Sequence, residues 1–539
     1  MRKFLALILV IAALLVPSCS LAVNLPEKDI IIVYTNDVHC GVDDFVGYAG
    51  LAQYRKQMQA LSPYVTLVDA GDAVQGATIG AISQGRYIIE IMNYLGYDVA
   101  VPGNHEFDYG WSQFENFVKN LSCGYVSCNL VDAVTGQLFL KPYKIIKYGN
   151  TKVAYVGICT PATITSSTPS SFMDSSGNYI YDFCGDLTGE KLCEAVQKAV
   201  NKARDEGADF VIAVAHLGEY KDVQEEWSAL RVIAGTRGID ALIDGHSHEV
   251  TECLKVKNLD GQEIIITQTG TKLHNIGKMV IDTKGEISSE LIAKTDGKDP
   301  DTEKFINDIK ARYEDTLKSK IGHTNFMLRA MDDEGNWLIR NGETGICDLV
   351  TDSLLHSAKS TKTGAADVAV YNAGGIRTNV NPGELTYGDA LSVLPFSNTV
   401  CICEVSGQTL LDELEHGARL FPEKSGGLLH VSGLTYTING KIPSPVKINE
   451  RGMFESIQGE RRVSDVKVNG EALDLEKLYK VIGTSYTLLA RGDGHMFKGA
   501  KIIEADYEVA CDSLVHYIKS LGELPERYKD SQNRINFVK

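Results

Sequence analysis

Metal-binding side chains recur in the first half of this 539-residue chain, each time directly after an apolar run. Carboxylates, an amide and imidazoles of this kind are the ligands that Zn²⁺ and Mn²⁺ prefer in proteins. A single histidine in such a place is ordinarily structural, but five successive apolar runs followed by donors are hard to explain in that way. The donor-bearing residues, run by run, are Asp37 and His39; Asp69 and Asp72; Asn104 and His105; His216; and His246 and His248.

The donors are numerous enough to hold two cations. Two carboxylate ligands would not neutralise two divalent ions, so the site keeps a positive charge that suits a hydroxide and a phosphate oxygen. Two ions about 3.5–4 Å apart can clamp both oxygens of an in-line displacement at phosphorus. The donor set therefore predicts a dinuclear centre that hydrolyses phosphoesters.

The apolar runs indicate how these side chains are positioned. Runs rich in Val, Ile and Ala, such as residues 30–34 and 209–215, are typical of strands buried on both faces. Segments with helical spacing, such as residues 50–60 and 190–205, lie between them and indicate an α/β layered domain. The carboxyl ends of such strands share one edge of the sheet, which is where ligands bind.

The length of the chain predicts two large domains. We expect the first at residues 28–299, a charged linking helix at 300–322, and a second domain at 325–539. Residues 1–19 have a basic start, a short apolar run and small residues, and predict a secretory signal. Two alternatives stay open there: lipidation of Cys19, which would be the sole membrane anchor, or simple cleavage and release.

The net charge of −17 limits the partners. An acidic chain repels polyanions, so we expect no polymeric nucleic acid as a partner. A small phosphorylated substrate remains compatible with this charge, because bound cations reverse the local field. The sequence makes no prediction of an oligomeric state.

Several motifs resemble a known family. The ordered set DVH, GDAVQG, GNHEFD, AHLG and DGHSH is similar to the calcineurin-like metallophosphoesterases. In the second half, YNAGGIR, LPFSN and GDG resemble the 5′-nucleotidases, which include bacterial UDP-sugar hydrolases. The resemblance covers roughly residues 28–535. It implies a four-layer β-sandwich flanked by helices, followed by a separate α/β C-terminal substrate-binding domain.

The resemblance also implies a division of roles. It makes His105 a catalytic residue that faces the substrate, with Asp108 fixing its ring. The nucleophile would be a hydroxide bridging the metals, so no covalent enzyme intermediate is expected. The seven donors are assigned to a first site, a second site and a bridge as follows: Asp37, His39 and His248; Asn104, His216 and His246; and Asp72.

The second-half motifs imply a nucleoside site, with some departures. Arg340, Asn372 and Arg377 match substrate contacts of the family, and Asp493 matches the acid that binds ribose hydroxyls. The family stacks the base between two phenylalanines. Leu428 stands at the first of these positions and Thr487 at the second, with Tyr486 beside it as a candidate replacement.

Together these features predict an enzyme that removes phosphate from nucleotides, most simply 5′-monophosphates. The altered clamp leaves other substrates open: a UDP-sugar, a 2′,3′-cyclic nucleotide or another phosphoester. A protein of a different class, a non-catalytic surface-binding lipoprotein, is the remaining alternative. The presence of every expected metal donor argues against it.

Overall fold

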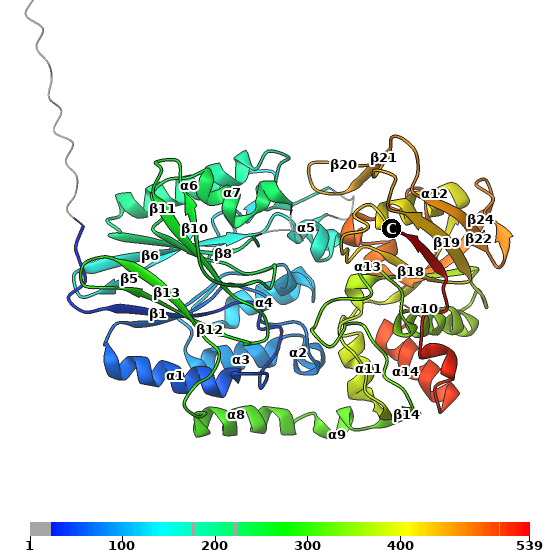
Figure 1. Ribbon diagram of the computed structural model, residues 1–539, viewed down its shortest axis with the longest axis horizontal. Coiled ribbons are helices and arrows are strands. Elements are labelled where there is room, and N and C mark those ends of the chain that lie inside the picture. The colour runs from blue at the N-terminus through cyan, green and yellow to red at the C-terminus, as the bar shows by residue number, and fades with distance from the viewer. Residues whose placement is uncertain (1–22, 175–177, 220–223, 506) are drawn as a thin grey trace, which may run out of the picture.

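The computed structural model describes residues 23–174, 178–219, 224–505 and 507–539. They form two domains that face each other, with two helices running beneath both (Figure 1). The expected signal at residues 1–19, including Cys19, lies outside the described residues. In the described part of the chain, no helix is long and apolar enough to cross a membrane.

The N-terminal domain is a sandwich of two sheets. The buried hydroxyl of Tyr34 in β1 lies 2.5 Å from the Thr267 hydroxyl in β11 and so ties one sheet to the other. The first sheet has the order β13 (Ile287–Ile292), β12 (Ile276–Ile281), β1 (Ile30–Thr35), β2 (Val65–Asp69), β3 (Val99–Ala100). The second has the order β10 (Val250–Lys257), β11 (Glu263–Thr269), β9 (Ala241–Ile243), β8 (Phe210–His216), β6 (Thr151–Cys159), β5 (Tyr143–Tyr148).

Helices cover both outer faces of the sandwich, which gives four layers. Helix α6 buries residues such as Val196 and Val200 at helical spacing, and they share a core with Ala213 of β8. On the other side, α1 and α3 join the core of the first sheet. The helices of this domain are α1 (Gly47–Leu61), α2 (Thr78–Ser83), α3 (Arg86–Leu95), α4 (Trp111–Asn120), α5 (Thr163–Ser166), α6 (Glu190–Asp205) and α7 (Ala229–Ala234). A short pair, β4 (Val131–Asp132) and β7 (Tyr181–Asp182), completes it.

Two helices connect the domains: α8 (Pro300–Ala311) and α9 (Glu314–Leu317). Helix α8 starts where the side chain of Asp299 accepts a hydrogen bond from the backbone N–H of Thr302, with proline at the first helical position. One face of α8 buries Ile306 and Ile309 in the N-terminal core. The linking helix is therefore docked on the first domain along one face.

The C-terminal domain is built around a mixed sheet of order β18 (Leu429–Ser432), β15 (Val368–Asn372), β24 (Leu478–Thr484), β17 (Val400–Ser406), β25 (Lys501–Glu504). Because successive side chains of a strand point to opposite faces, Ala369 joins the core under helices α10 and α14, whereas Val368 and Val370 join a second core. The helices are α10 (Gly345–Ser357), α11 (Tyr387–Val393), α12 (Gly407–Gly417), α13 (Ser485–Leu488) and α14 (Ala510–Leu521).

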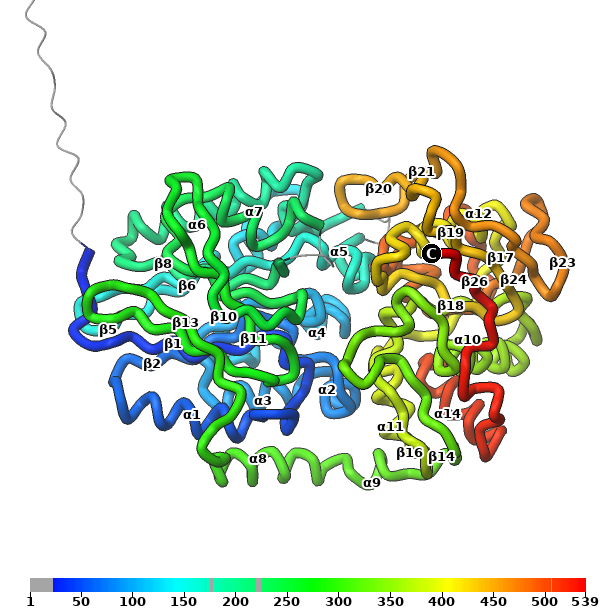
Figure 2. The backbone as a smooth tube through the Cα atoms, viewed as in Figure 1, coloured from blue at the N-terminus to red at the C-terminus, as the bar shows by residue number. Residues whose placement is uncertain are grey.

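Smaller sheets surround that layer. A four-stranded sheet, β23 (Glu471–Ala472), β22 (Val463–Val468), β19 (Leu434–Asn439), β26 (Ile535–Val538), packs over the second core. Two further pairs are β14 (Lys320–Thr324) with β16 (Gly383–Thr386), and β20 (Val446–Ile448) with β21 (Phe454–Ile457). The β20–β21 hairpin reaches the N-terminal domain near α5, where Arg451 pairs with Asp182 at 2.9 Å (Figure 2).

Candidate active site

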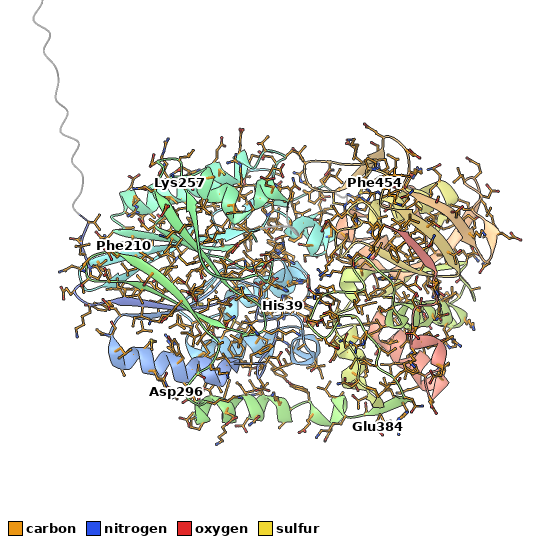
Figure 3. The ribbon with its side chains drawn as sticks, in the orientation of Figure 1. His39, Phe210, Lys257, Asp296, Glu384 and Phe454 are labelled. Carbon is orange, nitrogen blue, oxygen red and sulfur yellow. The ribbon has the colours of Figure 1, made fainter. Side chains whose placement is uncertain are left out.

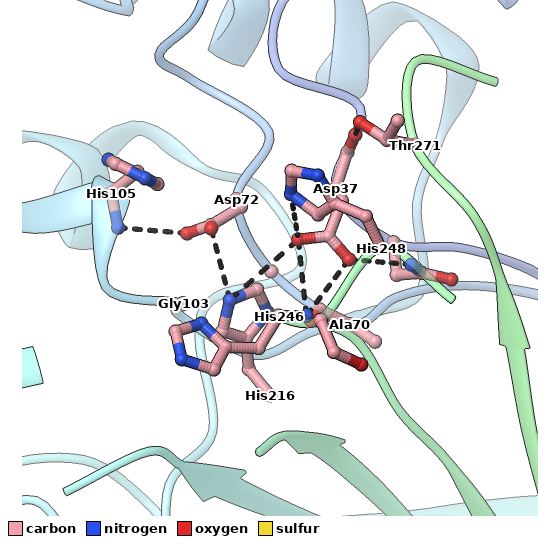
Figure 4. Close-up of polar contacts among 12 residues, drawn as sticks. Asp37, Ala70, Asp72, Gly103, His105, His216, His246, His248 and Thr271 are labelled. Carbon is pink, nitrogen blue, oxygen red and sulfur yellow. Dashed lines mark hydrogen bonds and ion pairs between the residues drawn. The ribbon is translucent and has the colours of Figure 1, made fainter. Parts of the chain in front are cut away.

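The predicted donors meet at the edge of the N-terminal domain that faces the C-terminal domain. Figure 3 shows His39 in this middle region of the molecule. The donors follow the carboxyl ends of β1, β2 and β3 in one sheet and of β8 and β9 in the other. Both sheets therefore contribute to one site, and Figure 4 shows Asp37, Asp72, His216, His246 and His248 clustered together.

One group of donors consists of Asp37, His39 and His248, whose ligand atoms lie within 4.8 Å of one another. The Nε2 atoms of His39 and His248 are 3.0 Å apart. The Nε2 of His248 is 3.4 Å from Oδ1 of Asp37. Two imidazole nitrogens and a carboxylate oxygen thus converge on one point, as a cation requires.

A second group consists of Asp72, His216 and His246, also within 4.8 Å. The Nε2 of His216 lies 3.0 Å from Oδ2 of Asp72. The same Asp72 oxygen is 3.8 Å from the Nε2 of His39, which belongs to the first group. The carboxylate of Asp72 therefore stands between the two groups.

The backbone at these positions is unusual. Asp37, His39, Asp72, His246 and His248 all have positive φ, between 45° and 81°. Each non-glycine residue in this conformation costs about 1–3 kcal/mol of backbone strain. It persists only where the surrounding structure imposes it. Five of the seven predicted donors share this feature, which marks the loops after the strands as a functional site.

Hydrogen bonds set the tautomers of two imidazoles. Nδ1 of His39 donates to the backbone carbonyl of Gln75 at 2.9 Å, and Nδ1 of His216 donates to that of Ala70 at 2.8 Å. Each Nε2 is then left with its lone pair facing the centre, as a metal ligand must be. The nearby acids Asp69, Asp244 and Glu106 do not orient these rings, because they accept hydrogen bonds from backbone N–H groups of the loops.

The chemistry of the donor set fits a pair of divalent cations. Oδ1 of Asn104 is buried and has no hydrogen-bond partner among the described residues. A buried polar oxygen of this kind needs a ligand, and an amide oxygen suits a divalent cation.

The charge states of Asp37 and His246 agree with that fit. Burial raises the pKa of Asp37, but the charges of His248 and His216 outweigh burial and bring the pKa to about 2. Burial lowers the pKa of His246 to about 3. An ionised carboxylate and a neutral imidazole are the forms that bind metals. Burial lowers the pKa of His216, but the carboxylates of Asp72 and Asp37 raise it overall to about 10, so a cation bound there displaces a proton from its Nε2.

His105 lies beside the donors with a different arrangement. It belongs to 3₁₀ helix η1 (His105–Phe107), and its Nδ1 is 2.5 Å from Oδ2 of Asp108. Burial lowers the pKa of His105, but the carboxylates of Asp108 and Asp72 raise it overall above the ordinary value. The second oxygen of Asp108 accepts a hydrogen bond from Ser167 at 3.1 Å. The imidazole is therefore fixed and favours its charged form. It also lies within 4.8 Å of ligand atoms of His39 and Asp72.

A cleft of about 540 Å³ opens between this site and the C-terminal domain. Leu428 lies away from it, because its side chain is 2% exposed and belongs to the core. Thr487 is also buried, at 1% exposure. The other predicted substrate residues line the cleft: Arg340, Asn372, Arg377, Tyr486 and Asp493.

The far end of the cleft is organised around Asp493, in the short 3₁₀ helix η6 (Gly492–Gly494). Asn372, at the end of β15, donates its side-chain amide to Oδ2 of Asp493 at 2.8 Å. The Tyr486 hydroxyl accepts from the backbone N–H of Asp493 and donates to the carbonyl of Thr165, both at 3.2 Å. Tyr486 thus joins the C-terminal wall of the cleft to the N-terminal domain.

Sequence reasoning missed two aromatic residues that hold the arginines. The guanidinium of Arg340 lies 4.5 Å from the ring centre of Trp337, and that of Arg377 lies 5.6 Å from the same ring and 5.9 Å from Phe396. Cation–π contacts of this kind restrain arginine heads. Phe396 belongs to the LPFSN motif. No sequence motif marks Trp337, and its place three residues before Arg340 was the only indication of its role. Sequence reasoning also missed two basic side chains that line the cleft, Arg419 and Lys424.

Residues 30–250 match the calcineurin-like phosphoesterase family, and residues 302–499 match the 5′-nucleotidase C-terminal domain. A snake venom 5′-nucleotidase of Gloydius brevicauda is 26% identical over 94% of this chain and 88% of its own length. The trifunctional nucleotide phosphoesterase YfkN of Bacillus subtilis is 25% identical over 92% of this chain and 34% of its length. The crystal structure of a 5′-nucleotidase precursor from Thermus thermophilus has the same fold, with a TM-score of 0.77 and 23% identity over 95% and 99% of the two chains.

Proposed function

Because this chain belongs to the calcineurin-like phosphoesterases that carry a 5′-nucleotidase C-terminal domain, we propose that it hydrolyses nucleoside 5′-monophosphates to a nucleoside and phosphate. A metal-dependent phosphoester hydrolase of this kind needs a cation site and a nucleoside site in one cleft. The observation that supports the proposal is that members of both sets line the same 540 Å³ space. From the cation set these are Asp72, Asn104, His246 and His248, and from the nucleoside set Arg340, Asn372, Arg377, Tyr486 and Asp493.

In this proposal the seven donors hold two divalent cations. Asp37, His39 and His248 bind one, and Asp72 lies between the two sites. The second is bound by Asn104, His216 and His246. When bound, the cations supply an activated water and neutralise charge on the phosphoryl oxygens. The protein contributes rigid loops, whose left-handed backbone conformations hold the donors in place.

His105 stabilises the negative charge that develops on the phosphoryl group. Its pairing with Asp108 keeps the ring oriented and favours the charged form. Arg377 lines the same cleft from the opposite wall, where burial lowers its pKa and the charges of Asp108 and Asp72 act against that lowering, so we assign its guanidinium to the phosphoryl group. Arginine suits this task because its fork can grip two phosphate oxygens.

The opposite wall holds the nucleoside. Asp493, oriented by Asn372, accepts hydrogen bonds from ribose hydroxyls. Arg340 also contributes a positive charge to this wall. The base lies against Tyr486, whose ring borders the cleft while Leu428 is buried away from it. One aromatic ring gives less stacking energy than two, so we expect selection among bases to be weak.

Two observations favour nucleotide substrates other than 5′-monophosphates. A relative with 25% identity is named a trifunctional nucleotide phosphoesterase, and this chain also lacks the expected pair of phenylalanines. Cyclic nucleotides and UDP-sugars are therefore tested beside 5′-monophosphates. Purified protein loaded with Mn²⁺ or Zn²⁺ is incubated with each substrate. Released phosphate is measured for the 5′-monophosphates, and the products of cyclic nucleotides and UDP-sugars are separated by chromatography, because their cleavage yields another phosphoester. AMP turnover above that of the chelated protein supports the proposal, and the absence of any phosphate release overturns it.

We also propose that the protein is exported, on the pattern of residues 1–19. Mass spectrometry of the mature N-terminus distinguishes the two forms. A lipid-modified Cys19 as the first residue indicates surface anchoring, whereas an unmodified start indicates release. Retention of the intact leader in the mature protein would contradict export.

A further inference from the structure

The proposed function leaves two cations of the cleft without a role. Arg419 and Lys424 line the cleft from the loop that follows α12. Backbone hydrogen bonds fix this loop at Ser425 and at the first residue of the glycine pair Gly426–Gly427. Gly374 donates to the carbonyl of Gly426 at 2.8 Å, and Ser425 donates to that of Arg340 at 2.9 Å. The two cations are thus carried by a segment that is docked on the nucleoside wall.

Arg419 has hydrogen-bonding capacity to spare. Its Nη1 donates to the carbonyl of His416 at 3.1 Å and its Nη2 to the carbonyl of Asp493 at 3.4 Å. A guanidinium has five N–H donors. Among the described residues, neither Arg419 nor Lys424 forms an ion pair with a carboxylate within 4.0 Å. Asp493 and Glu413 act on Arg419, and Lys424 acts on Asp332, only beyond this distance, so both cationic heads can contact a ligand in the cleft.

The glycine pair keeps the approach to Arg419 open. A β-carbon at position 427 would lie 3.3 Å from Nη1 of Arg419 and 3.0 Å from Cβ of Asp493. One at position 426 would lie 3.5 Å from Oδ1 of Asp493. Neither glycine has a positive φ. These two glycines are therefore not needed for their backbone conformation. They leave free space beside Asp493, the acid assigned to the ribose.

The charges on this wall exceed what a mononucleotide needs. Four basic side chains, Arg340, Arg377, Arg419 and Lys424, face the cleft with one acid, Asp493, although the whole chain carries −17. The cation next to the metal site is Arg377. A 5′-phosphate would occupy that end, and the nucleoside beyond it is neutral. Beyond Arg377, the basic side chains of this wall then outnumber its single acid, Asp493.

We propose that Arg419 and Lys424 form a second anion subsite, which binds a phosphate carried on the ribose hydroxyls of a 5′-nucleotide. The subsite deepens the proposed function and rests on it. Arg419 touches the backbone of Asp493, the residue assigned to the ribose, so the second anion belongs at the 2′ or 3′ position. Charge-assisted contacts to phosphate are strong and suit arginine and lysine. The substrate class is then a nucleoside bisphosphate, with cleavage at the 5′ end.

The test compares three adenine nucleotides on the metal-loaded protein: AMP, adenosine 3′,5′-bisphosphate and ADP. The subsite predicts that kcat/KM for the bisphosphate exceeds that for AMP by about tenfold or more, the size of one charge-assisted contact. In Arg419→Gln and Lys424→Gln variants, this ratio falls toward one. Lys467→Gln removes a charge from exposed strand β22, outside the cleft, and should keep the parent ratio.

The outcomes separate the subsite from the proposed function. If no nucleotide is hydrolysed, the proposed function is wrong. If AMP is hydrolysed but the bisphosphate is not preferred, the function holds and the subsite is wrong. A preference for ADP alone would also overturn the subsite, because it would place the second anion between phosphoryl centre and ribose. The subsite would also be wrong if Arg419→Gln and Lys424→Gln both kept the parent ratio of kcat/KM for the bisphosphate to that for AMP.

Discussion

The two walls of the cleft are built in different ways. On the N-terminal wall, seven donors follow strands that are almost wholly buried, and their loops have left-handed conformations. On the C-terminal wall, the arginines come from loops and are held by contacts with Trp337 and Phe396. The first arrangement fixes the positions of the metal-binding atoms. The second leaves room for different ligands. We therefore expect variants of the first wall to abolish turnover and variants of the second to shift substrate preference.

The largest effect is expected for Asp72→Asn. This carboxylate stands between the two donor groups, so its loss removes a shared anionic ligand. We expect turnover to fall by about a thousandfold or more, because water activation and charge neutralisation fail together. Metal content, measured by elemental analysis, should fall as well. Asp465→Asn is the matched control, since that exposed aspartate also has positive φ and lies outside the cleft.

The second prediction concerns His105→Asn. The proposed role of His105 is charge stabilisation, so turnover should fall by about a hundredfold to ten-thousandfold. The two cations should remain bound at the parent level. His516, which pairs with Glu508 at 3.1 Å on the exposed surface, gives a matched control as His516→Asn. Metal-depleted His105→Asn protein would show that His105 is a ligand, as its proximity to His39 and Asp72 also allows.

A third prediction addresses the nucleoside wall. Asp493→Asn keeps a side chain that tolerates positive φ but removes the charge that would bind ribose hydroxyls. We expect KM for AMP to rise by about tenfold, the size of a hydrogen bond to a charged group. The rise should be larger for AMP than for p-nitrophenyl phosphate, which has no ribose. Equal rises for both esters would mean that this wall does not recognise the nucleoside.

The smallest effect is expected at Tyr486. Tyr486→Ala should raise KM for AMP by about fivefold, the equivalent of one lost aromatic contact. Tyr486→Phe keeps the ring while losing the hydrogen bonds to Asp493 and Thr165, so it separates stacking from positioning. An unchanged KM in Tyr486→Ala would show that the base binds elsewhere.

The same contrast explains what the sequence could predict. Asp37 and Asn104 follow buried strands of one sheet, whose ends converge, so their meeting is readable from the pattern. His216 ends a strand of the second sheet, and its arrival at the same site depends on how the two sheets pack. The two-domain α/β architecture and the helix at Glu190–Asp205 were predicted for the same reason. Trp337 lies in a loop whose path depends on tertiary packing, and no periodicity reveals such contacts.

The second wall also shows where family motifs mislead. Leu428 occupies a position that the resemblance makes a base contact, yet it is buried in the core. A motif match places a residue on the chain but does not fix which way its side chain faces. The cations Arg419 and Lys424 fall outside every motif, and their place in the cleft followed only from the folded loop.

The central claim is that seven donors of the N-terminal wall bind two divalent cations. Crystals grown with Mn²⁺ and measured near its absorption edge test this directly by anomalous diffraction. We expect two strong anomalous peaks about 3.5–4 Å apart, with the carboxylate of Asp72 between them. His105 should lie outside direct bonding distance of both peaks. A map with no peak at this position, or with peaks bound by other residues, would contradict the account.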